Sequence, residues 1–166
     1  MTPQEAQTIA QFVARGIAQE MPATLGVFRA VPEGRLDYRP DPTSKTALGL
    51  LRHIALEDEW FLNSIAAGSF TPPPDDSDAC GIGTPEQAAA FYAERIPAAL
   101  DRVRAMTGEQ LAEDIDFLGM MKMPAVAFLS LMSHHSVHHR GQLSAYLRAM
   151  GGKVPGIYGP SADTAN

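Results

Sequence analysis

The sequence predicts an all-α protein, an antiparallel bundle of four helices, from three observations. Apolar residues recur at the helical spacing of three and four over four long stretches. No stretch shows the convincing alternation of a half-buried strand. Prolines, glycines and capping residues separate the four stretches from one another. With 166 residues, the chain is expected to form a single domain over residues 1–166.

The first two predicted helices cover residues 3–30 and 46–67. Pro22 lies inside the first and should kink or divide it, because proline lacks the amide donor and crowds the preceding turn. The second helix is apolar on more than one side, which is typical of a helix packed against several neighbours. The candidates for the core in the first helix are Ile9, Phe12, Val13, Ile17, Met21 and Leu25.

The last two predicted helices cover residues 85–106 and 124–150. Thr84 begins a capping motif directly before the third helix. Residues 107–123 are expected to form an irregular connection between these two helices, and a tail of residues 151–166 follows the last one. A pair of glycines at the start of that tail ends the fourth helix.

Composition and charge argue against several functions. A net charge of -6 and a pI near 5.3 do not suit a nucleic-acid surface, which needs clustered lysine and arginine. The sequence has no apolar run long enough to cross a bilayer and no start that resembles a signal peptide, so we expect a cytoplasmic protein without a membrane partner. Cys80 is the one cysteine, and its place in a loop rich in proline, aspartate and glycine favours an ordinary thiol over a nucleophile.

Four of the five histidines lie close together on the fourth predicted helix. Residues four apart share a helix face, which gives the pairs His134 with His138 and His135 with His139. The apolar stripe of this helix includes the position of His139 and has His135 at its edge, whereas the other pair points to roughly the opposite side. Two imidazoles that point inward at this spacing provide half of a transition-metal site.

A third ligand must come from another helix. His53 on the second predicted helix is the first candidate, and Glu57, which shares its face, is the next. Asp58 lies among apolar residues of the same helix, where it could orient a ligating histidine or form an ion pair with an arginine. A site of three histidines leaves coordination positions open, which is typical of catalytic metals. Ser136 stands where the HExxH motif has its glutamate base, so a metalloprotease is not favoured.

Three segments carry a resemblance to a known family: HxxxHRGQ at residues 135–142, LLRHI at residues 50–54 and VPGIYG at residues 154–159. Together they resemble the DinB/YfiT-like family of metalloproteins, and the likeness extends over nearly the whole chain. The resemblance implies a four-helix bundle in up-down-down-up order, usually dimeric.

The resemblance also implies one divalent metal, zinc or nickel, held by His53, His135 and His139. Gln142 lies three residues beyond His139 and is a candidate to orient a ligating histidine through a hydrogen bond. No residue is assigned to catalysis beyond the metal ligands and these neighbouring polar groups.

The resemblance implies an activity as well, since some relatives use a low-molecular-weight thiol that is activated at the metal. We therefore predict a metal-dependent thiol S-transferase, with a small thiol and an electrophile as substrates. Two alternatives stay open, a metal-dependent hydrolase and a non-catalytic metal-binding protein of the stress response. A homodimer is also expected, both from the resemblance and from the large apolar surface of the second helix.

Overall fold

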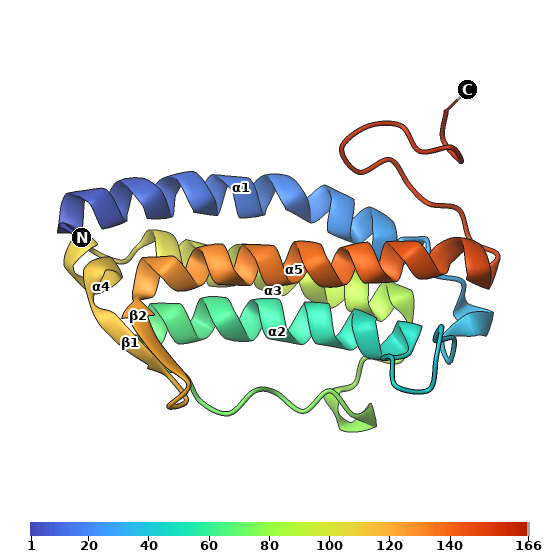
Figure 1. Cartoon of the computed structure of the whole chain (residues 1–166), viewed down its shortest axis with the longest axis horizontal. Helices are drawn as coiled ribbons and strands as arrows, with labels where there is room; N and C mark the ends of the chain where they lie inside the picture. The colour runs from blue at the N-terminus through green and yellow to red at the C-terminus, as the bar shows by residue number, and fades with distance from the viewer. Residues whose placement is uncertain (166) are drawn as a thin grey trace.

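The computed structural model describes residues 1–165, and most of them are helical. Four long helices lie side by side along the long axis of the molecule (Figure 1). Helix α2 packs against α3 and α5, and α1 packs against the same two helices. The prediction of a mostly helical chain is confirmed. The long helices are α1 (Pro3–Arg29), α2 (Ala47–Ala67), α3 (Pro85–Arg104) and α5 (Ala125–Leu147).

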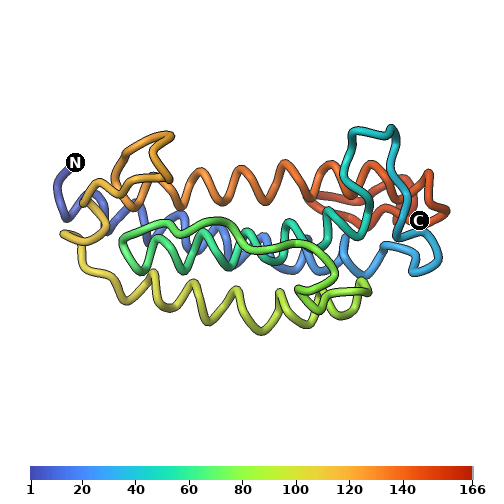
Figure 2. The backbone as a smooth tube through the Cα atoms, turned by 90° about the horizontal axis from the view of Figure 1, so that it is seen from below, coloured from blue at the N-terminus to red at the C-terminus, as the bar shows by residue number. Residues whose placement is uncertain are grey.

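The helices run in two opposite directions. In Figure 1, α1 and α5 run one way along the bundle and α2 and α3 run the other way. Because α2 and α3 run the same way, the chain must return along the bundle between them. Residues 68–84 make this return beside α2, as the views in Figures 1 and 2 show. The segment contains one short 3-10 turn, Asp78–Cys80.

The prediction of an irregular connection over residues 107–123 is wrong. This segment contains a short helix, α4 (Gly108–Ala112), and an antiparallel hairpin that pairs Ile115 with Met123. The strands β1 (Asp114–Phe117) and β2 (Met121–Pro124) have four residues each, too few for an alternating pattern to be read from the sequence. The turn places Leu118 at a φ of 54°, a conformation that leucine rarely adopts and that gives no sequence signal.

The prediction for α1 is right in position and partly wrong in orientation. The helix is continuous from Pro3 to Arg29, so Pro22 does not divide it. Ile9 and Phe12, both expected in the core, are 38% and 71% exposed. Alanines occupy much of the inward face instead, because small side chains let α1 approach its neighbours closely. The buried residues of this face include Ala6, Ala10, Ala14 and Ile17.

The close contact between α1 and α4 explains why residue 108 is a glycine, and it leads to a testable prediction. A Cβ atom on Gly108 would lie 2.4 Å from the backbone oxygen of Pro3. Because a backbone atom cannot rotate away, Gly108→Ala should lower the free energy of unfolding by about 1–3 kcal/mol, the usual cost of overpacking. Gly16→Ala is the control, since nothing lies within 4 Å of its added Cβ. Alanine there should stabilise the helix by about 0.5–1 kcal/mol. Urea unfolding of both variants measures the difference, and equal effects would contradict the packing described.

None of the helices in residues 1–165 combines the length and the apolar character that crossing a bilayer requires. Most of the large apolar residues of α2 point into the bundle instead, while Leu48, Leu56 and Trp60 are partly buried. Those with at most 4% exposure are Leu50, Leu51, Ile54, Phe61, Leu62 and Ile65.

Candidate metal centre

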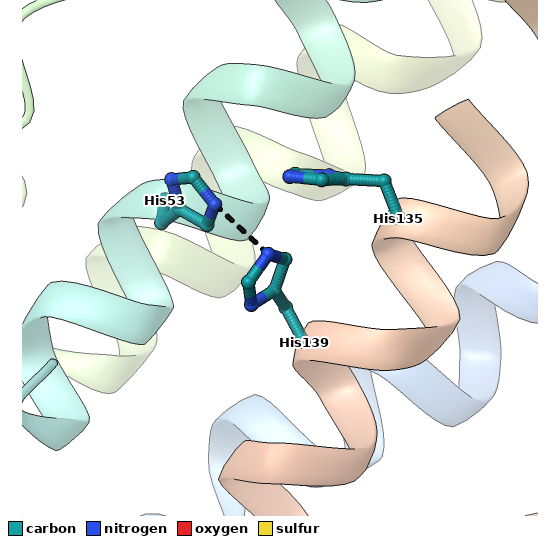
Figure 3. Close-up of side chains that lie close together, drawn as sticks. All are labelled: His53, His135 and His139. Atoms are coloured by element: carbon teal, nitrogen blue, oxygen red, sulfur yellow. Dashed lines mark hydrogen bonds between the residues drawn. The ribbon is translucent and has the colours of Figure 1, made fainter. Parts of the chain in front are cut away.

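Three histidines converge where α2 faces α5. Figure 3 shows His53 from α2 pointing toward His135 and His139, which lie one turn apart on α5. Each ring offers one nitrogen, and the three atoms all lie within 4.8 Å of one another. The Nε2 atoms of His53 and His139 are 3.1 Å apart. The structure thus brings together the three residues that the sequence and the resemblance single out.

The other two histidines of α5 lie outside this group. His134 and His138 are exposed, while His135 and His139 are partly buried. This difference follows from the helical period, because each exposed residue precedes its partly buried neighbour by about 100° of rotation.

The distances among the three nitrogens suit one tetrahedral ion. Zinc binds imidazole nitrogen at about 2.0–2.1 Å, so two nitrogens on one tetrahedral ion lie about 3.3 Å apart. The distance of 3.1 Å between His53 and His139 is close to that value. The three donor nitrogens lie at most 4.8 Å apart, so the rings would need to approach one another further to reach this geometry at all three contacts. A divalent transition metal is the ion that a set of imidazole donors prefers.

Polar side chains lie behind two of the three rings. The Nδ1 atom of His139 donates to Oε1 of Gln142 at 2.7 Å, which leaves the Nε2 lone pair pointing toward the other histidines. The Nδ1 atom of His53 lies 3.8 Å from Oε1 of Glu57, close but longer than a hydrogen bond. Gln142 therefore orients its histidine directly, and Glu57 lies beside the other.

His135 has a nitrogen that lacks any partner. Its Nδ1 atom is buried, and it makes no hydrogen bond to any residue between 1 and 165. A buried polar atom without a partner is costly, and the cost falls when an ion or a hydrogen-bonding group binds there. An ion bound through this nitrogen would satisfy it.

The three rings are neutral at neutral pH. Burial, followed by the charges of the neighbouring histidines, lowers the pKa of His53 to about 4. The same causes lower the pKa of His135 to about 4, and burial lowers the pKa of His139. Because imidazole binds a metal only through a free lone pair, these lowered pKa values keep the donors ready to bind.

Asp58 does not contact any of the histidines through a hydrogen bond in the described part of the chain. Its fully buried Oδ2 accepts from the Ser136 hydroxyl at 2.6 Å and from the Tyr92 hydroxyl at 2.9 Å. These bonds join α2, α3 and α5, and the partner on α5 is the residue that follows His135. Neither expected role occurs, since the bonds go to hydroxyls rather than to a histidine or an arginine. Burial raises the pKa of Asp58 to about 7.

The contributions of Ser136 and Tyr92 were missed by sequence reasoning. A helical wheel places Ser136 about 60° from His139 and about 160° from both exposed histidines, so a buried hydroxyl was a signal within reach. Tyr92 belongs to the apolar face of α3, where a hydroxyl needs an acceptor. The pairing of both with Asp58 depends on how three helices meet, which no single helix pattern contains.

An aromatic cluster covers the site on the side of the hairpin. The ring of Phe61 lies 5.7 Å from that of His135. Phe117 of β1 stacks on Phe61 at 5.8 Å and on Phe128 at 5.7 Å. The hairpin that the sequence did not reveal thus shields one flank of the histidines with apolar rings. Cys80, in the short 3-10 turn after α2, does not belong to the histidine cluster.

Comparisons with known proteins show which family the chain belongs to. A family model described as the DinB family matches residues 7–166. The uncharacterized protein YjoA of Bacillus subtilis (strain 168) is 30% identical over 123 residues, which are 73% of this chain and 77% of that protein. The uncharacterized protein YrdA of the same organism is 42% identical over 57 residues, 34% of each chain.

Two crystal structures share the fold. The DinB-like protein YjoA of Bacillus subtilis superposes with a TM-score of 0.69 at 23% identity, over 89% of this chain and 97% of that one. A DinB-like protein of Bacillus cereus ATCC 10987 gives a TM-score of 0.73 at 23% identity, over 88% of this chain and 95% of that one. The family resemblance read from the histidine segments is confirmed, and the chain belongs to the DinB family.

Proposed function

We propose that this protein is a metal-dependent thiol S-transferase, in which His53, His135 and His139 hold one zinc or nickel ion. The proposal takes the long helices as an up-down-down-up bundle with the site between α2 and α5. One observation carries it: three neutral imidazoles meet at a point that is still partly open to solvent, with the His53 side chain 15% exposed. Three protein donors leave room for a substrate on a four-coordinate ion, as in catalytic rather than structural sites.

Different residues of the chain have different roles at such a site. A divalent ion held there supplies Lewis acidity and lowers the pKa of a thiol that binds to it. Gln142 fixes the tautomer and orientation of His139 through the bond of 2.7 Å. The rings of Phe61 and Phe117 exclude water from one flank, which strengthens electrostatic interactions at the histidines.

A conjugation assay tests the activity. Protein purified without a histidine tag is depleted with a chelator, reloaded with zinc or nickel, and assayed for addition of small thiols to a chromogenic aryl halide. We expect turnover only in the reloaded protein, and equal turnover in Cys80→Ser. Full activity after complete chelation would contradict the proposal. Hydrolysis of an aryl ester without any thiol conjugation would favour the hydrolase instead, and metal binding without either reaction would favour the non-catalytic protein.

The lowered histidine pKa values predict how the metal-free protein responds to acid. The folded pKa of His53 and of His135 is about 4, against about 6.5 in an unfolded chain. Between these values the unfolded chain binds more protons, so the free energy of unfolding should decrease as pH falls from 6.5 to 4 and then level off. Because the rings are partly solvated, we expect no more than about 1 kcal/mol per pH unit.

Asp58 has the opposite effect on the free energy of unfolding. Because its pKa is raised in the folded protein, the folded protein binds a proton at Asp58 at a higher pH than the unfolded chain does, which stabilises the fold as pH falls. The histidine contribution is therefore isolated by comparing the wild type with His135→Gln in urea unfolding at several pH values. The variant should lose less stability between pH 6.5 and 4 than the wild type. Parallel pH profiles would show that the His135 ring is not held neutral by the fold.

We propose in addition that the protein forms a homodimer, although through a different surface from the one first expected. Most large apolar side chains of α2 are buried inside the bundle, whereas Ile9 and Phe12 on α1 are 38% and 71% exposed. Light scattering at micromolar concentration should give twice the chain mass of 17.8 kDa, and Phe12→Ser should shift it toward a single chain. A single-chain mass for the wild type would rule the dimer out.

A further inference from the structure

Lys45 lies at the rim of the histidine site, at the start of α2. It directly precedes Thr46, the N-cap of this helix, and His53 follows seven residues after Thr46. The backbone oxygen of Lys45 accepts a hydrogen bond from the Tyr146 hydroxyl at 3.4 Å, and Tyr146 follows seven residues after His139 on α5. Seven residues are two helical turns, or about 10 Å. The start of α2 thus places the Lys45 backbone two turns from His53, and the Tyr146 hydroxyl holds it against α5. A lysine side chain spans part of this distance.

The charge of Lys45 reaches the site. Burial lowers the pKa values of His53 and His139, and the Lys45 charge adds a smaller lowering, whereas burial raises the pKa of Glu57 and the Lys45 charge offsets part of that rise. Asp76 acts on His53 and Glu57 in the opposite sense. The ion pair between Lys45 and Asp76 lies at the end of α2 from which His53 is two helical turns away.

Another anion can replace Asp76 as the partner of Lys45 without disturbing the fold. The Nζ atom of Lys45 lies 2.8 Å from Oδ2 of Asp76, and the two side chains are 43% and 42% exposed. A pair with this exposure contributes little to stability. The main chain of Asp76 is held separately, because Nη1 of Arg52 donates to its carbonyl oxygen at 3.4 Å. The carboxylate of Asp76 can turn away from Lys45 while the backbone of residues 68–84 stays in place.

Arg52 itself is not available to a ligand. Its Nε donates to the carbonyl oxygen of Ile82 at 2.6 Å, and its Nη2 lies 2.7 Å from Oδ1 of Asp78. The side chain is only 10% exposed. Lys45, with an exposed partner and an exposed ammonium group, is the cation at this rim that a soluble anion can reach.

The two flanks of the site differ in chemistry. On the hairpin side, Trp60 packs on Phe61 at 4.9 Å and on Phe117 at 5.9 Å, next to His135. At the start of α2 stands the ammonium group of Lys45. A molecule that binds across the histidines would meet apolar rings on one side and a positive charge on the other.

We propose that Lys45 binds an anionic group, such as a carboxylate, on the molecule that reacts at the three-histidine site, and that this group replaces Asp76 as the partner of the lysine. The inference rests on the proposed metal site and names a class of substrate for it: molecules that carry a negative charge a few bonds from the reacting atom.

Two small thiols test the inference by binding alone. The probes are 3-mercaptopropionate, which carries a carboxylate, and 2-mercaptoethanol, which does not. Both are titrated into cobalt-loaded protein while the visible absorption of the cobalt is followed, and the ratio of the two dissociation constants is compared among wild type, Lys45→Met and Lys45→Arg. Intrinsic differences between the thiols cancel in this comparison.

We expect the preference for the anionic thiol to fall about fivefold in Lys45→Met, the effect of one partly exposed charge, and to be kept in Lys45→Arg. Asp76→Asn, which removes the competing carboxylate, should increase the preference. The preference should also weaken at high salt.

An unchanged ratio in Lys45→Met, with cobalt still bound at one ion per chain, would overturn the role of Lys45 and leave the metal site standing. Failure of the wild type to bind cobalt would instead overturn the metal site, and the inference with it. A misfolded Lys45→Met protein would be recognised by its loss of cobalt, and Lys45→Gln would then replace it in the same comparison.

Discussion

Replacing His135 by alanine is expected to lower zinc affinity by more than about 100-fold, whereas replacing His134 is expected to leave it unchanged. The expected loss exceeds the 10–100-fold effect typical of groups that only support a ligand, because an entire donor is removed. The two residues are adjacent on α5, yet His135 lies in the cluster and His134 is exposed. They are therefore a matched pair in helix, residue type and distance from the helix ends.

The same contrast extends to the next turn and to the opposite helix. His139→Ala and His53→Ala should each lose the ion, and His138→Ala should keep it. Competition with a chromophoric chelator measures all five affinities in the same protein background. Retention by His135→Ala together with loss by His134→Ala would mean that α5 presents the other face to α2, and the site described would be wrong.

Replacing Arg140 by alanine is expected to lower the free energy of unfolding by about 3–5 kcal/mol, the usual effect of breaking a buried ion pair. The Arg140 side chain is 2% exposed, and its Nη2 lies 2.6 Å from Oε2 of Glu20. Its guanidinium also donates to the Tyr158 hydroxyl at 2.7 Å and to the Thr24 hydroxyl at 3.3 Å. One side chain therefore joins α5, α1 and the tail after α5.

Arg148→Ala is the matched control for this prediction. Arg148 also bonds from the end of the bundle to the tail, through Asp163 at 3.0 Å, but its side chain is 57% exposed. Its loss should change stability little, because an exposed pair is largely solvated in both states. Urea unfolding compares the variants, and limited proteolysis should show earlier cleavage of the tail in Arg140→Ala. Equal unfolding midpoints for the two variants would contradict the role given to Arg140.

The helices and the inward pair of histidines could be predicted because both follow from one regular period. Twenty residues of helical pattern average out local exceptions, and a rigid helix fixes the directions of His135 and His139 relative to its apolar stripe. The same period left His53 undecided, since apolar residues surround it on α2. For His53, the family resemblance indicated a role as a metal ligand, which the helical pattern alone could not.

The remaining features depend on contacts between segments far apart in the chain. Asp58 on α2 takes its partners from α3 and α5, and Lys45 takes Asp76 from the connection between α2 and α3. The hairpin depends on a leucine at positive φ, which no propensity would suggest. Phe12 was misplaced because the alanine face of α1 is apolar as well, and the closeness of neighbouring helices decided which face turned inward.

X-ray absorption spectroscopy of the zinc-loaded, tag-free protein tests the central claim most directly, because it counts the donors around the ion. We expect one zinc per chain, with three imidazole nitrogens at about 2.0 Å and one further light donor. A sulfur donor from Cys80, or fewer than three imidazoles per zinc, would contradict a site built from His53, His135 and His139.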